Sequence, residues 1–156
     1  MLHIIKSDLR CLREPKRAKI LSGFFKTGKG EYAEGDMFIG VTVPNTRLIA
    51  QKYKDLDLKV AERLLQSPIH EERLLALIIL TLQMKKGSNL KQKIIYELYM
   101  KNRTFINNWD LVDLSADKIV GSYLANRSRN ILTTLARSQN VWDRRIAILA
   151  TFHKKQ

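Results

Sequence analysis

The stretch from Asn108 to Ser115 places an aromatic residue and a carboxylate at a spacing that could support chemistry. Its pattern predicts the first turns of a helix, in which an Asn accepts a bond from a free backbone N–H and Asp110 suits the helix dipole. Trp109 and Asp113 are then four residues apart on one face. Asp113 falls at the border of the apolar stripe, where a carboxylate is costly unless it is paired or lines a wet cleft. Either Trp109 anchors the core and an Arg holds Asp113, or both face a substrate.

A second group of candidate residues lies in the last predicted helix. Its apolar stripe is formed by Trp142, Ile146, Leu149 and Phe152. Arg145 falls inside that stripe, whereas Arg144 points about 100° away. A cation among core positions needs an anion, either an internal carboxylate such as Asp113 or Asp143 or a phosphate reached across a groove.

The composition indicates one domain, residues 1–156, with an anionic partner. Lys and Arg outnumber Asp and Glu by 28 to 15, and the net charge of +13 favours nucleic acid or an anionic membrane as partner. The longest apolar run, Leu74 to Leu82, is about half the span that a bilayer needs. Lys6 and Asp8 interrupt the apolar start, so no secretory signal is visible. We expect a cytosolic protein with no membrane partner.

The sequence predicts neither a metal nor a cofactor. Cys11 is the only cysteine, and the three histidines, His3, His70 and His153, are far apart in sequence. No disulfide framework or recognisable metal-ligand spacing results. The glycine-rich segment 26–36 does not fit a phosphate-binding loop, because the pair Lys26-Thr27 precedes the glycines. We expect this segment to be a structural loop.

The hydrophobic periodicity predicts an all-α chain. Helical patterns run to about residue 13, over 15–25 and from 44 to about 53, then over 58–66, 68–86, 90–101, 107–124, 128–138 and 140–153. The only β-like run, 38–43, lacks a partner and is predicted to be extended chain. The joints between the later helices are short and polar, which implies antiparallel neighbours.

A weak internal echo favours a repeat architecture. Residues 72–77 resemble residues 143–148 at an offset of 71, and Trp109-Asp110 recurs as Trp142-Asp143 at an offset of 33. Helix pairs that repeat in this way are typical of an α-solenoid of the HEAT or armadillo kind, with a concave face that would here be basic. Equivalent helices line that face, so Asp113 and Arg145 can converge on it with Trp109. An irregular all-α bundle is the alternative.

Three motifs, taken together, resemble one known family. They are residues 24–36 with 38–41 and 43–47, residues 108–113, and residues 142–149. In this order and approximate spacing they resemble the DNA alkylation repair family, the HEAT-like-repeat alkylpurine DNA glycosylases of the AlkD type. The resemblance runs from about residue 20 to the end of the chain.

The resemblance implies an all-α superhelix that grips duplex DNA in a basic concavity and removes 3- and 7-alkylated purines without flipping the base. It gives Trp109 the role of the aromatic that faces the lesion's sugar and backbone, Asp113 that of the catalytic carboxylate, and Arg145 that of the arginine gripping the backbone. Further DNA-binding candidates are Arg127, Arg129, Arg144 and Trp142. It also implies a cytosolic, nucleoid-associated protein of a bacterium or archaeon.

The residue types agree with this chemistry. A purine alkylated at N3 or N7 already carries positive charge, so it can leave without a general acid through an oxocarbenium-like transition state. Asp113 can supply a fixed negative charge that also orients water, and Trp109 an electron-rich face for the cationic lesion. One carboxylate then suffices, whereas ordinary glycoside hydrolysis usually requires two.

The chain departs from the family pattern at its end. Family members typically continue for several more helices and carry another groove-lining tryptophan, whereas this chain stops at Gln156. We therefore expect a fragment, or a natural short form whose exposed C-terminal end permits an oligomer or which has lost activity. The alternatives to a glycosylase are a non-catalytic DNA-binding solenoid, such as a truncated inactive paralogue, and a protein-binding HEAT scaffold.

Overall fold

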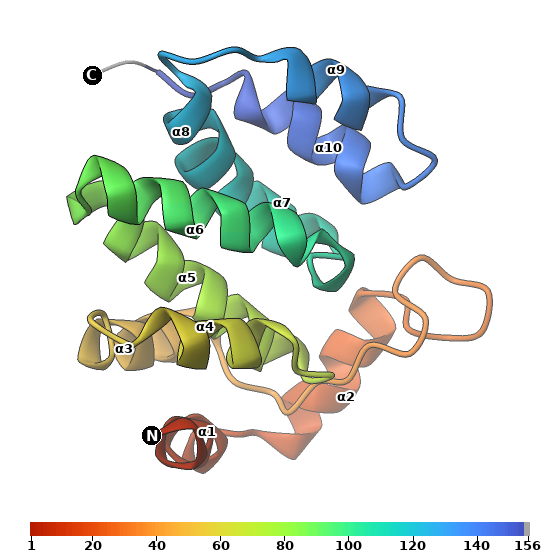
Figure 1. The fold of residues 1–156 in the computed structure, drawn as a ribbon. Helices are drawn as coiled ribbons and strands as arrows, with labels where there is room; N and C mark the ends of the chain where they lie inside the picture. Colours follow the sequence, from red (N-terminus) through yellow and green to blue (C-terminus); the bar gives the residue numbers. More distant parts are fainter. Residues whose placement is uncertain (155–156) are drawn as a thin grey trace. The chain divides into compact units, whose positions relative to one another are not determined.

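A computed structural model describes residues 1–154, which are mostly helical (Figure 1). No strand forms within this range, where an isolated bridge between Met37 and Ile69 is the nearest approach to one. The predicted all-α fold is confirmed. The chain divides into an N-terminal unit, Met1–Ile79, and a C-terminal unit, Leu80–Gln156, with the boundary inside one helix, α5.

The N-terminal unit consists of short helices with identifiable start signals. They are α1 (Leu2–Cys11), α2 (Pro15–Phe24), α3 (Val43–Lys52), α4 (Leu58–Leu65) and the first part of α5 (His70–Lys86). Thr42 Oγ1 accepts a bond from the Asn45 N–H at the start of α3, and Asp57 Oδ1 accepts one from the Lys59 N–H at the start of α4. These helices begin and end close to the predicted ranges.

The first turn of α5 buries four consecutive polar residues, 70–73. The Glu72 carboxylate accepts a bond from Ser67 Oγ at 2.5 Å and pairs with Lys6 Nζ at 2.9 Å and Arg10 Nη2 at 3.3 Å. The Glu71 carboxylate accepts bonds from the backbone of residues 39 and 40. Carboxylates that bind so many donors hold α1 and the chain around residue 40 against α5.

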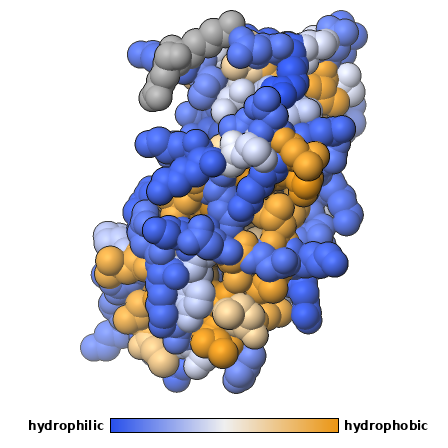
Figure 2. Space-filling view, turned by 60° about the vertical axis from the view of Figure 1, so that its left-hand side comes forward, coloured by the Kyte–Doolittle hydropathy of each residue, from blue (hydrophilic) through white to orange (hydrophobic). Residues whose placement is uncertain are grey.

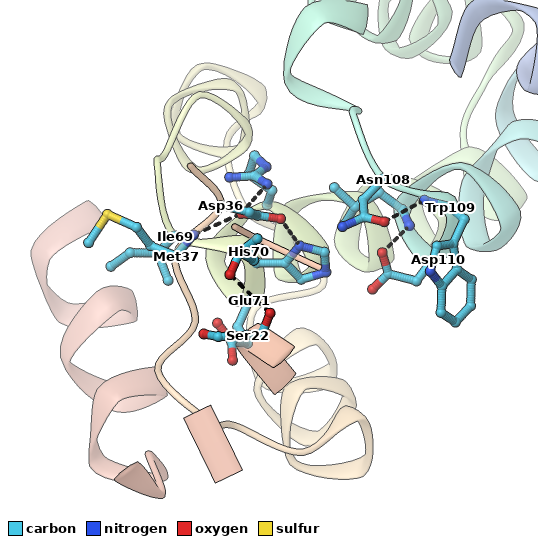
Figure 3. Close-up of polar contacts among 12 residues, drawn as sticks. Ser22, Asp36, Met37, Ile69, His70, Glu71, Asn108, Trp109 and Asp110 are labelled. Carbon is cyan, nitrogen blue, oxygen red and sulfur yellow. Dashed lines mark hydrogen bonds and ion pairs between the residues drawn. The ribbon is translucent and has the colours of Figure 1, made fainter. Parts of the chain in front are cut away.

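Asp36 ties the end of the glycine-rich loop to the same turn of α5 (Figure 3). Its carboxylate lies 2.7 Å from His70 Nδ1 and accepts a bond of 2.7 Å from Arg73 Nη2. The His70 ring also stacks on Phe38, with centroids 4.5 Å apart. The end of the loop is therefore held against α5 by a histidine–aspartate pair that the sequence did not reveal.

The C-terminal unit adds further helices after α5. They are α6 (Asn89–Lys101), the 3-10 turn η1 (Arg103–Phe105), α7 (Trp109–Ala116), the π-helical turn η2 (Asp117–Gly121), α8 (Ser122–Leu124), α9 (Asn130–Ala136) and α10 (Val141–Ala150). Helix α10 packs against α7, η2 and α9. The single helix predicted over 107–124 is thus interrupted by η2. Ser115 Oγ donates to the Leu111 carbonyl at 2.6 Å just before the interruption, a back-bond that tends to bend helices.

The internal echo between residues 72–77 and 143–148 is a repeated structural device. In each copy a serine five residues before the acid, Ser67 or Ser138, donates to its carboxylate and accepts from the N–H two residues on. The following arginine, Arg73 or Arg144, donates to the carbonyl of that serine at 3.0 or 2.8 Å. We call this arrangement the serine–acid–arginine clamp. The two copies share hydrogen-bond geometry as well as residue types, and this similarity supports the predicted repeat architecture.

Hydrophilic side chains cover much of the surface, and hydrophobic ones gather in the lower part of the view in Figure 2. The exposed apolar residues of α1 and α3 in the N-terminal unit include Ile4, 53% exposed, and Leu48, 66% exposed. A basic surface on a concave face stays a prediction.

We predict that Asp36 contributes to stability in a pH-dependent way. Burial opposes its ionisation, but bonds and charges from His70 and Arg73 outweigh burial and lower the pKa of Asp36 below 3.8. A depressed folded-state pKa gives stability that is present above the unfolded pKa, about 4, and is lost as pH falls through the folded value. Urea unfolding from about pH 6 to 3 should therefore show a steeper loss for wild type than for Asp36→Asn. Asp55→Asn, which changes an exposed acid, should follow wild type, and equal slopes for all three would contradict the prediction.

We also predict that Gly40 cannot be replaced without cost. Its φ is +82°, and a Cβ there would lie 2.0 Å from the Glu14 carbonyl oxygen. Gly35 has nearly the same φ, +80°, with no heavy atom within 4 Å of an added Cβ. Gly35→Ala should thus lower the free energy of unfolding by about 1 kcal/mol through backbone strain alone, and Gly40→Ala by about 3 kcal/mol or more. Equal losses in urea titrations would show that the close approach is unimportant.

Candidate active site

Helix α7 positions both residues of the central candidate pair. Asn108 is its N-cap, and the Asn108 side-chain oxygen accepts a 2.8 Å bond from the Trp109 N–H, as predicted for this stretch (Figure 3). The residues Leu111, Val112, Ser115 and Ala116 form the buried face. Trp109 is half-buried and Asp113 is exposed, so the acid borders the buried face as expected.

Asp113 forms a bidentate ion pair with Arg145 of α10. Arg145 Nε donates to Asp113 Oδ1 at 2.6 Å, and Arg145 Nη2 donates to Asp113 Oδ2 at 2.7 Å. The side chains stay 35% and 44% exposed for the acid and the arginine. The bond to Asp113 raises the pKa of Arg145. Two of the three residues expected to converge are therefore in direct contact, and the third lies one helical turn before Asp113.

The helical-wheel placement of Arg145 among the core positions of α10 is wrong, because its side chain is 44% exposed. The buried residues of α10 are Ile146, Ala147 and Ala150, and Phe152, expected in the apolar stripe, is 65% exposed. The helix ends at Ala150, so Phe152 does not continue its face. Arg145 is instead an exposed cation held by an exposed acid.

Two contacts fix the position of α10 within the C-terminal unit, and so also the position of Arg145. At its start, Asp143 pairs with Arg103 Nε at 3.1 Å and with Ser138 Oγ at 2.9 Å. At its end, Gly121 of η2 approaches so closely that a Cβ there would lie 2.6 Å from the Ala150 carbonyl oxygen. Sequence reasoning missed Arg103 and Gly121. A glycine inside a helical pattern was the available signal for a close approach.

The other four candidate DNA-binding residues differ in their contacts and their exposure. Arg144 is half-buried and donates to the carbonyls of residues 138 and 139, so it holds the joint before α10. Arg127 lies over the Tyr123 ring, 4.0 Å from its centroid, and donates to the Tyr123 carbonyl. Arg129 is exposed at the N-cap of α9, and Trp142 is half-buried in the first turn of α10.

The described part of the chain, residues 1–154, contains no group of three or more His, Cys, Asp or Glu side chains arranged to hold a metal ion. Within the same range no helix has the length and apolar character required to cross a bilayer.

Positive charge is concentrated in the C-terminal unit. Its sequence holds 14 Lys and Arg against 5 Asp and Glu, a balance of +9 out of the total of +13. Of the five acids, Asp113, Asp143 and Glu97 already pair with basic side chains. The unit that carries the candidate site is therefore suited to attract a polyanion.

Comparison with known proteins identifies the family. The family model described as DNA alkylation repair enzyme matches residues 5–156. No curated protein and no solved structure matches the chain.

We predict that the Asp113–Arg145 pair contributes little to stability. Exposed ion pairs are typically worth up to about 1 kcal/mol, because solvent screens them. A double-mutant cycle of Asp113→Asn and Arg145→Gln, measured by urea unfolding, should give a coupling free energy of about 1 kcal/mol or less. A coupling of about 3 kcal/mol would instead show that the pair holds α7 and α10 together, and any loss of function would then have to be separated from unfolding.

Proposed function

The chain belongs to the DNA alkylation repair enzyme family, which implies DNA as its substrate, and we propose that it hydrolyses the N-glycosidic bond of cationic 3- or 7-alkylated purines in duplex DNA. The observation that carries this proposal is the bidentate Asp113–Arg145 pair, whose carboxylate is oriented by two short bonds yet stays 35% exposed. A carboxylate in this state can face a substrate without a large rearrangement.

The proposed reaction uses one fixed negative charge. An alkylated purine leaves as a neutral base, so its departure needs no proton, and positive charge develops on the sugar. The Asp113 carboxylate would stabilise that charge and orient the water that attacks C1′. The base need not leave the helical stack if the acid reaches the sugar from the backbone side. Water is the only co-reactant: its oxygen bonds to C1′ as the bond from C1′ to the purine nitrogen breaks, and its proton is released to solvent.

Trp109 and Arg145 would position the lesion against Asp113. The indole of Trp109, half-buried one turn before Asp113, offers an electron-rich face to a cationic nucleotide. Arg145 uses Nε and Nη2 on Asp113, and its Nη1 has no hydrogen-bond partner among the described residues. That remaining donor group suits a phosphate oxygen next to the lesion.

The other candidate residues would help to bind the DNA. Arg127 is fixed by its stack on Tyr123, and Arg129 is exposed, so both can contact phosphate. Arg144 and Trp142 would act mainly by holding the start of α10, since Arg144 already donates to two carbonyls.

A second candidate function is DNA binding without catalysis. The balance of +9 in the C-terminal unit favours it, because charge alone supplies sequence-independent affinity. In that case Asp113 would serve only to orient Arg145 toward the sugar-phosphate backbone of the DNA.

We predict that wild type releases 7-methylguanine from methylated duplex DNA and that Asp113→Asn lowers the single-turnover rate by about 100-fold or more, as expected for loss of one electrostatic group. Asp117→Asn removes a carboxylate from the adjoining turn and serves as the matched control, with a rate close to wild type. Equal rates for wild type and Asp113→Asn would exclude the catalytic role. Tight binding without release by any variant would favour the non-catalytic function.

A further inference from the structure

Helix α9 lies beside α10 (Figure 1) and carries a polar, solvent-exposed face outside the Asp113–Arg145 site. An open hollow of about 550 Å³ is lined by Asn130, Thr133, Thr134 and Arg137. These residues follow helical spacing and so share one side of the helix. The opposite side is apolar, with Leu132 and Leu135 buried. The hollow is therefore formed by side chains that do not support the core.

The segment of sequence that contains this hollow has cations and no acids. Residues 126–142 include three arginines and neither Asp nor Glu. The next acid along the chain, Asp143, is already bound by Arg103 and Ser138. Among the described residues, neither Arg129 nor Arg137 has an ion-pair partner, and both are exposed. These two cations are available to an external anion.

The chemistry of the face fits a phosphodiester backbone better than a protein or a lipid surface. Arginine, threonine and asparagine side chains are the usual donors to phosphate oxygens in nucleic-acid complexes. The central part of a protein interface is commonly aromatic or aliphatic, and a membrane-bound helix needs apolar side chains on its exposed side. No large hydrophobic residue is exposed over residues 126–140 of this face.

We propose that this face of α9 is a second DNA-binding surface, which contacts the phosphodiester backbone through Arg137 and the threonine hydroxyls, with Arg129 at the start of the helix as a neighbouring phosphate contact. It shares no residue with the Asp113–Arg145 pair, which α10 and α7 form. The proposal rests on the proposed function only in taking DNA as the partner. A second surface would let the protein hold duplex beyond the lesion, or hold it while Asp113 is not engaged.

The test measures binding of a short undamaged duplex to the full chain by fluorescence anisotropy over a range of salt concentrations. Arg137→Glu should weaken binding by about fivefold or more and reduce the slope of log affinity against log salt by about 1. Arg63→Glu makes the same change of charge on exposed α4 and should weaken binding by less than about twofold. Arg137→Gln, which removes only the charge, should give an intermediate loss and covers the case in which the glutamate variant folds poorly.

Three results would overturn the proposal: wild-type affinity for both Arg137 variants, an equal loss for Arg63→Glu, or displacement of DNA from wild type by polyglutamate at lower concentration than by competitor duplex. If wild type releases no base, the proposed glycosylase activity fails, while the binding comparison still decides the role of α9.

Discussion

A carboxylate buried or half-buried at the start of a helix must be given hydrogen-bond donors, and this requirement recurs in both units. Transfer of an ionised acid out of water costs several kcal/mol unless donors and cations replace the water. Glu72 obtains them from Ser67, Lys6 and Arg10, and Asp143 obtains them from Ser138 and Arg103. Because these donors come from the preceding joint and from other helices, each clamp fixes how a helix enters the fold.

The candidate site occurs where this device is absent. At the offset of 33 that relates Trp109 to Trp142, the position of Arg144 is occupied by the buried Leu111. Both α7 and α10 begin with an asparagine cap, Asn108 and Asn140, but only α10 adds the clamp, and Asp113 is left at the edge of the buried face of α7. Its cation comes from α10, whose start is fixed by the clamp at Asp143. Helix α10, which begins with the clamp, therefore positions Arg145. Helix α7, which lacks the clamp, presents Asp113.

The sequence was most informative where the interaction is local. Helix positions followed from apolar spacing and caps, and the clamps were visible as the echo between residues 72–77 and 143–148. The Asp113–Arg145 contact could be predicted as one of two alternatives because a repeat brings equivalent helices together. The wheel over residues 140–153 placed Arg145 inside the apolar stripe because it counted Phe152 in that stripe, whereas α10 ends at Ala150. The Asp36–His70 pair joins residues distant in sequence, and hydrophobic periodicity cannot predict such a contact. Periodicity also gives no sign of the π turn η2, which follows the back-bond from Ser115 to the Leu111 carbonyl.

The arginines of the C-terminal unit divide into two physical classes, and this division bears on how DNA would be bound. Arg103 and Arg145 are matched by Asp143 and Asp113, so they add geometry and almost no net charge. The excess of +9 must therefore come from cations without an acid, among which Arg137 on α9 is one. Long-range attraction and its sensitivity to salt would then arise away from the carboxylate, where a concentrated positive field would oppose a positively charged sugar. Separating the two classes allows the chain both to attract a polyanion and to keep excess positive charge away from Asp113, where a cationic sugar would form.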